Sequence, residues 1–134
     1  MKLSLTFITL AIISIPRFVN AEPIYLECNI KYKEFSDDYS ISVDLETRRV
    51  DSSFHAAHSK NNNIVLDYSG TAEALLDKDK IIYKINRDSL DWIFVIDRKT
   101  LQIERYISDS GDEDFGRGSC KIIEVSGRKS TLAN

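Results

Sequence analysis

Polar and apolar residues alternate along most of the chain after residue 23, as expected for β-strands with one buried face. The clearest alternation runs over 24–33 and places five residues on one apolar face: Ile24, Leu26, Cys28, Ile30 and Tyr32. A second run at 39–46 does the same with Tyr39, Ile41, Val43 and Leu45. Both segments therefore predict strands that pack against a core with every second side chain.

Shorter apolar runs follow at 64–68, 81–86, 92–96, 101–107 and 121–125. They are separated by turn-forming residues, among them 61–63, Ser69-Gly70, 77–80 and the long segment 108–118. The segment 71–76 has two interpretations, a short helix capped by Thr71 or a strand that ends at the turn 77–80. We predict a mainly β fold, an antiparallel barrel or sandwich of about seven or eight strands.

The predicted core collects the residues in the apolar phase of these strands. They are Leu26, Ile30, Tyr39, Ile41, Val43, Leu66, Ile85, Trp92, Phe94, Ile96, Ile103 and Ile122.

The chain also matches itself weakly at an offset of 53 residues. Segments 38–50 and 91–103 share the pattern Asp-aromatic-x-apolar-x-apolar-Asp-x-x-Thr-x-x-apolar, which pairs Asp44 with Asp97 and Thr47 with Thr100. The pattern predicts a strand that enters a tight turn whose backbone amides bind the Asp carboxylate. Two similar hairpins are expected. Two-fold pseudo-symmetry and the general likeness of good hairpins both remain open as the explanation.

Residues 1–21 read as a secretory signal peptide. Lys2 precedes an apolar-rich run at 3–15, and Val19-Asn20-Ala21 offers a cleavage site after Ala21. The run is shorter than the roughly 20 apolar residues of a membrane-spanning helix. We expect residues 22–134 to form one β domain that is exported to the periplasm or the medium, without a membrane anchor after cleavage.

Removal of this segment leaves 16 basic side chains (18 − 2) and 21 acidic ones, a formal charge of −5. An acidic excess is the opposite of what nucleic-acid binding requires, so we expect no nucleic-acid partner. It also disfavours binding to an anionic membrane surface.

Cys28 and Cys120 are the only cysteines, 92 positions apart. Their even number in an exported chain favours a disulfide, and the sequence has no CxxC pair or adjacent histidine to suggest metal-binding thiols. We expect the bond to tie the first strand of the domain to the last.

These features resemble small, uncharacterised exported bacterial β-rich proteins. The shared elements are a Cys in the first strand, the Ile96-Asp97-Arg98-Lys99-Thr100 hairpin and a C-terminal Gly118-Ser119-Cys120. The chain departs from that pattern at Leu101, where such turns prefer Gly. The resemblance implies a secreted, disulfide-closed β domain and brings no catalytic residues.

His55 and His58 are the first candidates for chemistry. On a helix they would share a face and could bind Zn²⁺ or Cu²⁺ with a third ligand, whereas on a strand they would point to opposite faces. The flanking serines, lysine and asparagine favour a polar surface loop.

The acidic segment 109–114 is the second candidate. Its four carboxylates, Asp109, Asp112, Glu113 and Asp114, could attract a basic partner or Ca²⁺, but the ligand spacing of a calcium loop is absent. The neighbouring glycine-rich segment 115–119 is interpreted as a flexible turn before the disulfide strand.

No pattern in the sequence selects a catalytic nucleophile or a cofactor. We therefore expect a non-enzymatic exported protein that binds or inhibits an unknown protein or small ligand. The alternatives are a hydrolase of the cell envelope and a lipocalin-like carrier of a small ligand. A filled interior would favour the first expectation, an aromatic-lined cavity the carrier, and histidines convergent on an acid the enzyme.

Overall fold

The computed structural model describes residues 22–61, 63–108 and 115–123, except for the side chains of 64–67. These residues form nine strands: β1 (Ile24–Lys31), β2 (Phe35–Asp44), β3 (Arg49–Ser59), β4 (Asn63–Glu73), β5 (Leu75–Leu76), β6 (Lys80–Arg87), β7 (Leu90–Asp97), β8 (Gln102–Ile107) and β9 (Gly116–Ile122). The described part of the chain contains no helix that is long and apolar enough to span a membrane.

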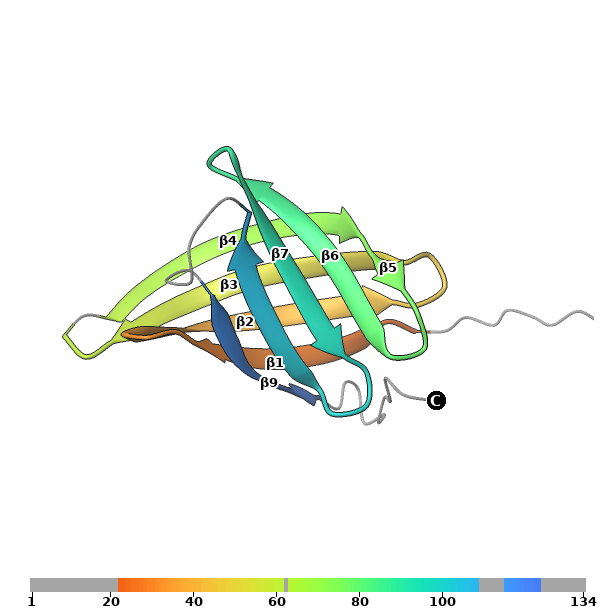
Figure 1. The fold of residues 1–134 in the computed structure, drawn as a ribbon, viewed down its shortest axis with the longest axis horizontal. Helices are drawn as coiled ribbons and strands as arrows, with labels where there is room; N and C mark the ends of the chain where they lie inside the picture. Colours follow the sequence, from red (N-terminus) through yellow and green to blue (C-terminus); the bar gives the residue numbers. More distant parts are fainter. Residues whose placement is uncertain (1–21, 62, 109–114, 124–134) are drawn as a thin grey trace, which may run out of the picture.

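All nine strands belong to one antiparallel sheet with the order β4-β3-β2-β1-β9-β8-β7-β6-β5. Two meanders, β1–β4 and β6–β9, meet where β1 pairs with β9, and the sheet curls into a nearly closed barrel (Figure 1). The sheet is not closed between β4 and β6. Within the described residues β4 pairs only with β3. On its β5 side, β6 is paired only at Ile81 and Ile82.

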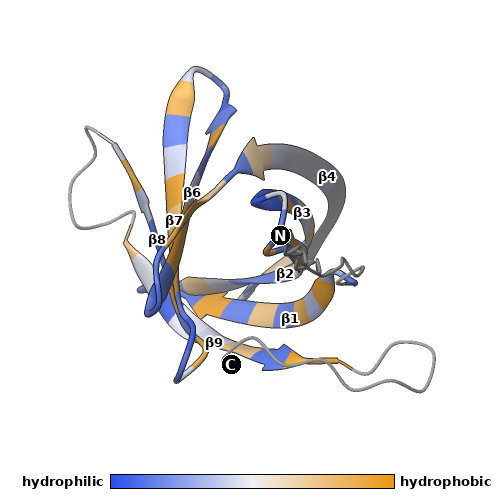
Figure 2. Ribbon diagram, turned by 90° about the vertical axis from the view of Figure 1, so that its right-hand side faces the viewer, coloured by the Kyte–Doolittle hydropathy of each residue, from blue (hydrophilic) through white to orange (hydrophobic). Residues whose placement is uncertain are grey.

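The predicted alternation accounts for most of the core. Hydrophobic and polar positions alternate along the strands (Figure 2). Nine predicted core residues are buried: Leu26, Ile30, Tyr39, Ile41, Val43, Ile85, Phe94, Ile96 and Ile103. Trp92 and Ile122 are partly buried and pack against this core. Leu66 lies in the segment whose side chains are not described.

Two local predictions need correction. The strand interpretation of 71–76 is right and the helix is wrong, because Thr71 to Glu73 continue β4 and Leu75-Leu76 form the extra strand β5. The glycine-rich segment is not a turn, because Gly116 to Ser119 belong to β9. A Cβ atom at Gly118 would lie 1.7 Å from the backbone oxygen of Asn29, so β9 needs glycine there to approach β1.

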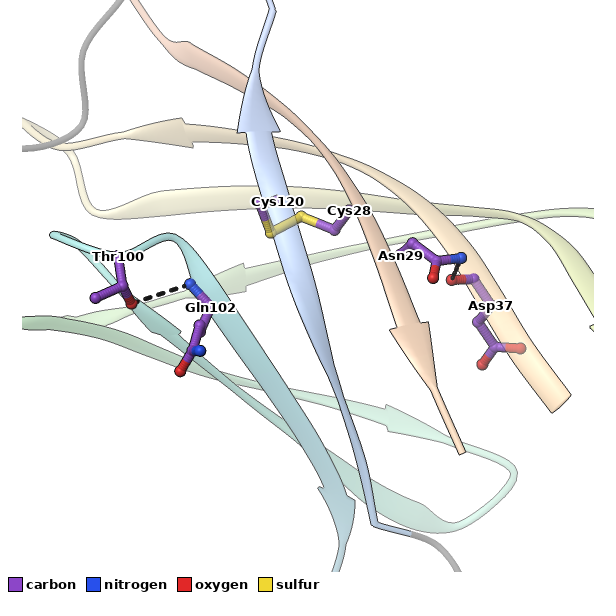
Figure 3. The surroundings of a disulfide bond; sticks show 6 residues. All are labelled: Cys28, Asn29, Asp37, Thr100, Gln102 and Cys120. Atoms are coloured by element: carbon purple, nitrogen blue, oxygen red, sulfur yellow. Dashed lines mark hydrogen bonds between the residues drawn. A yellow bond between two sulfur atoms is a disulfide. The ribbon is translucent and has the colours of Figure 1, made fainter. Parts of the chain in front are cut away.

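The predicted disulfide joins β1 to β9, the first strand to the last (Figure 3). Cys28 and Cys120 face each other directly in the register of the two strands, with an S–S distance of 2.02 Å. Both cysteines belong to the buried core. A buried disulfide of this kind indicates an oxidising, exported environment.

The two hairpins predicted from the internal match share their geometry. Val43 pairs with Val50, and Ile96 pairs with Ile103, which is the same register 53 residues later. Asp44 accepts hydrogen bonds from the amides of residues 46 and 47, and Asp97 from those of residues 99 and 100. The predicted binding of turn amides by an Asp carboxylate is therefore confirmed.

Each hairpin turn also ends in a residue with a left-handed backbone, Arg48 with φ 65° and Leu101 with φ 64°. Their carbonyl oxygens accept hydrogen bonds from the backbone amides of Ala74 and Cys120, so each turn is hydrogen-bonded to a later segment of the chain. The positive φ explains why a turn of this type prefers Gly where this chain has Leu101.

The substitution Arg48→Gly should raise the free energy of unfolding by about 1 kcal/mol, because glycine adopts a positive φ without steric cost. Arg49→Gly is the matched control, since this neighbour starts β3 without a positive φ. Its substitution should lower the free energy of unfolding by roughly 0.5–1 kcal/mol. Urea unfolding measures both. A loss of stability in Arg48→Gly would contradict the strain.

The double substitution Cys28→Ala/Cys120→Ala should lower the free energy of unfolding by about 4.6 kcal/mol. The bond spans 92 positions, and its removal frees that loop in the unfolded chain. The urea m-value should rise as well, because the unfolded chain expands. Equal midpoints for the oxidised protein and the double variant would refute the contribution.

Candidate functional site

A β-bulge in β3 places both histidines on the outer face of the barrel. Tyr39 pairs with Phe54 and the preceding Asp38 pairs with Ala56, so His55 is an extra residue between two regular pairs. The extra residue shifts the alternation by one position. The expectation of a surface loop was therefore wrong, and so was that of opposite faces on a strand.

The two imidazoles bind neighbouring residues of β2. His58 Nε2 lies 2.8 Å from Asp38 Oδ2, and His55 Nε2 lies 2.7 Å from Ser40 Oγ. Asp38 also accepts a hydrogen bond of 2.7 Å from the side chain of Asn29 on β1. Three strands thus supply two neighbouring sets of hydrogen-bonded side chains, Asn29–Asp38–His58 and His55–Ser40.

The pKa of Asp38 reflects these contacts. Partial burial alone would raise the pKa, but the hydrogen bonds from Asn29 and His58 and the nearby imidazoles outweigh burial and hold it below the usual 3.8. Asp38 is therefore ionised at all but strongly acid pH. Its side chain is 43% exposed, so this charge is accessible from the solvent.

Asn29, Asp38, Ser40 and His55 line an open groove of about 500 Å³ across β3, β2, β1 and β9, which we call the outer groove. His58 does not line this groove but binds Asp38, which does. Its polar side chains offer both signs of charge as well as neutral donors and acceptors: Glu27, Asn29, Asp38, Ser40, His55, Ser119 and Lys121. Such a lining suits recognition of a polar surface by hydrogen bonds and ion pairs.

This arrangement provides neither a set of metal ligands nor a catalytic triad among the described residues. Among the described residues no group of three or more His, Cys, Asp or Glu side chains is placed to hold a metal ion, so His55 and His58 lack a third ligand there. Ser40 and His55 form a serine–histidine pair, but Asp38 is bound by His58 and does not orient His55 as a triad would require.

The interior contains a second cluster that the sequence did not reveal. Arginine and aromatic side chains alternate across one end of the barrel, and we call this the arginine–aromatic stack. Arg105 lies 4.4 Å from the ring of Tyr32 and 4.2 Å from that of Trp92. Arg87 lies 5.2 Å from Trp92 on its other side and 4.1 Å from Tyr68.

Arg105 is almost fully buried and forms an ion pair of 3.5 Å with Asp37, which also accepts a hydrogen bond from the Tyr39 hydroxyl. Burial raises the pKa of Asp37 above 3.8 despite the opposing effect of Arg105. The native state then binds this proton more tightly than the unfolded state, so this group lowers stability as the pH rises from 3.8 through the folded pKa. Burial also raises the pKa of Tyr39 to about 12.

The alternation does carry a signal for this cluster. Asp37 lies in the inward phase of Tyr39, Ile41 and Val43, and Arg105 in that of Ile103 and Ile107. A charged residue in an apolar phase is a candidate for a buried ion pair. The sequence alone does not show which inward charges meet.

A small cavity lies among the described interior side chains. The cavity beside the stack measures about 10 Å³, room for a single water molecule, and is lined by Tyr39, Ser52, Phe54, Tyr68, Ile85, Arg87, Trp92 and Phe94. Its lining is largely aromatic, as a carrier would require, but the cavity is too small for an organic ligand and Arg87 lies among the rings. The other candidate, the acidic loop with Asp109, Asp112, Glu113 and Asp114, lies outside the described residues.

Asp38 should stabilise the fold in a pH-dependent way that Asp38→Asn lacks. Because its folded pKa is lowered, the contribution is complete above the unfolded pKa and disappears as the pH falls through the folded one. The difference in unfolding free energy between wild type and variant should become smaller as the pH falls from about 5 to below about 4. Urea unfolding across this range measures it, and a difference that stays constant at acid pH would contradict the shift.

Asp37→Ala should lower the free energy of unfolding by about 3–5 kcal/mol, because the buried guanidinium of Arg105 loses its carboxylate. The double variant Asp37→Leu/Arg105→Met should lose far less, since apolar side chains of similar size replace the pair. A double-mutant cycle measures the coupling. Losses that add in the double variant would show that the two groups do not depend on each other.

We found no match between this chain and any protein-family model, curated protein or solved structure. The resemblance to exported bacterial proteins therefore stays a prediction.

Proposed function

We propose that this protein is a small, exported, non-enzymatic binding protein of the periplasm or the medium, whose partner contacts the outer groove. The observation that carries the proposal is the size of the cavity found among the described interior residues, only about 10 Å³. A cavity of that size holds no more than a water molecule, so we assign ligand contact to the outer surface and the loops. The outer groove is where a bulge gathers polar side chains from three strands.

The chemistry of the groove favours a polar and basic partner. Asp38 is ionised and half-exposed, and Glu27 lies in the same groove. Lys121 lies 3.9 Å from Glu27 and offsets that charge, so Asp38 is the carboxylate of the groove left to attract a cation. The domain after residue 21 carries a net charge of −5, which would speed the approach of a cationic protein. An inhibitory role needs no further feature, because a rigid sheet face that covers a partner's surface can block it.

Neither alternative is supported as well. A lipocalin-like carrier needs ligand volume inside the barrel, and the aromatic lining instead surrounds Arg87. An envelope hydrolase needs an oriented base, and both histidines do lie near one acid. Asp38, however, binds the histidine that does not contact Ser40.

The double variant Asp38→Asn/His58→Gln should weaken partner binding, whereas Asp91→Asn should not. Asp91 is a matched control, because this outward carboxylate on β7 also accepts a hydrogen bond from an asparagine, Asn86. The partner is captured from periplasm and medium with the wild-type domain and purified, and its association is followed by surface plasmon resonance. We expect the groove variant to associate about tenfold more slowly with a flatter salt dependence. Equal rates for all three proteins would refute the groove as the contact.

Trp92 reports on the carrier alternative, because it is the only tryptophan and contacts the interior cavity. A fluorescence titration with a long-chain fatty acid should leave the wild-type emission unchanged. A saturable change at one ligand per protein would replace the proposed function with that of a carrier.

A further inference from the structure

Arg87 occupies a ring of aromatic side chains at the mouth of the barrel. Its guanidinium carbon lies 4.1 Å from the centre of the Tyr68 ring, 5.2 Å from that of Trp92 and 5.8 Å from that of Phe54. The rings come from β3, β4 and β7, and we call them the cation cage. Cations within about 6 Å of several ring centres are attracted by the negative faces of the rings.

We propose that the cation cage is a binding site for the guanidinium group of a ligand or partner, and that Arg87 occupies this site in the free protein. This site is distinct from the outer groove and does not depend on the function proposed for it. The ligand chemistry follows from the present occupant, a planar delocalised cation that lies in contact with Tyr68.

The placement of Arg87 makes an exchange of occupants possible. Arg87 is the last residue of β6, and its side chain is 23% exposed, so it can rotate outward without opening the core. Its ion pair with Asp88 is weak for two reasons. The Arg87 Nε lies 3.6 Å from the carboxylate oxygen, and the Asp88 side chain is 81% exposed to solvent. Arg105 cannot exchange in this way, because only 3% of its side chain is exposed.

The seam between β4 and β6 gives the site an entrance. Within the described residues the two strands are not paired there, and the side chains that meet across the seam include Arg87 with Tyr68. Gly70 approaches Ile85 closely, since a Cβ atom at Gly70 would lie 3.1 Å from the Ile85 side chain. Outward rotation of Arg87 would join the small cavity of about 10 Å³ to the surface. An incoming guanidinium would then stack on Tyr68 and Trp92 and meet Asp88 at the rim.

The test compares ethylguanidinium with the uncharged and nearly isosteric ethylurea, using Trp92 fluorescence as the readout. Arg87→Ala should bind ethylguanidinium saturably and about tenfold more tightly than wild type, in which Arg87 competes. Lys84→Ala is the matched control, because it removes a cation from the outward face of the same strand and should behave as wild type. Equal binding of ethylurea, or no saturable change in Arg87→Ala, would overturn the proposal.

A second measurement does not depend on the folding of the variant. In wild-type protein we expect the ring currents of the cage to shift the Nε–H NMR signal of Arg87, because its guanidinium lies over the rings. Added ethylguanidinium should move this signal towards that of free arginine and leave the signal of Arg105 in place. An Arg87 signal that does not respond at saturating probe would overturn the exchange even if the variant failed to fold.

Discussion

The pairing of β1 with β9 is the contact on which the rest of the structure depends. It is the only ladder in the described chain between strands that are distant in sequence, and it joins two meanders that would otherwise be separate sheets. Three features serve it: the Cys28–Cys120 bond, the absence of a side chain at Gly118, and the inward apolar faces of both strands. A long-range contact is costly in chain entropy, and the covalent bond removes much of that cost.

The opposite seam of the barrel is held by side chains. Between β4 and β6 the arginine–aromatic stack replaces a hydrogen-bonded ladder, with Arg87 between rings of β4 and β7. Buried arginine carries a desolvation cost, which Asp37 offsets for Arg105 and the aromatic faces offset in part for both arginines. One seam is thus closed by a hydrogen-bonded ladder and a disulfide, and the other by side-chain contacts between arginine and aromatic rings.

The two faces of β2 link these clusters. Asp37 points inward to Arg105, and the next residue, Asp38, points outward to His58. Burial raises the pKa of the first carboxyl group, whereas hydrogen bonds to Asn29 and His58 lower the pKa of the second. Two adjacent and chemically identical groups therefore have opposite effects on stability as the pH changes, solely because of the face that each occupies.

Much of the fold could be predicted from the sequence by itself. Period-two alternation located the strands and their inward phase, since a half-buried strand must alternate. The spacing from Asp44 to Thr47 and from Asp97 to Thr100 located two turns, because a carboxylate binds amides only two and three positions ahead. Cysteine arithmetic located the closure of the barrel. All of these features depend on local geometry or on a single possible pair.

The candidate sites depended on tertiary structure. The bulge at His55 arises from the register of β3 against both neighbouring strands, so the histidine spacing alone predicted the wrong arrangement. Asp37 and Arg105 are 68 residues apart (105 − 37), and only closure of the sheet brings them together. Arg87 is of a residue type that is usually exposed at the surface, yet its guanidinium lies among aromatic rings from three other strands. Sequence determines which face a side chain occupies, but its partners across a barrel are decided by how the sheet closes.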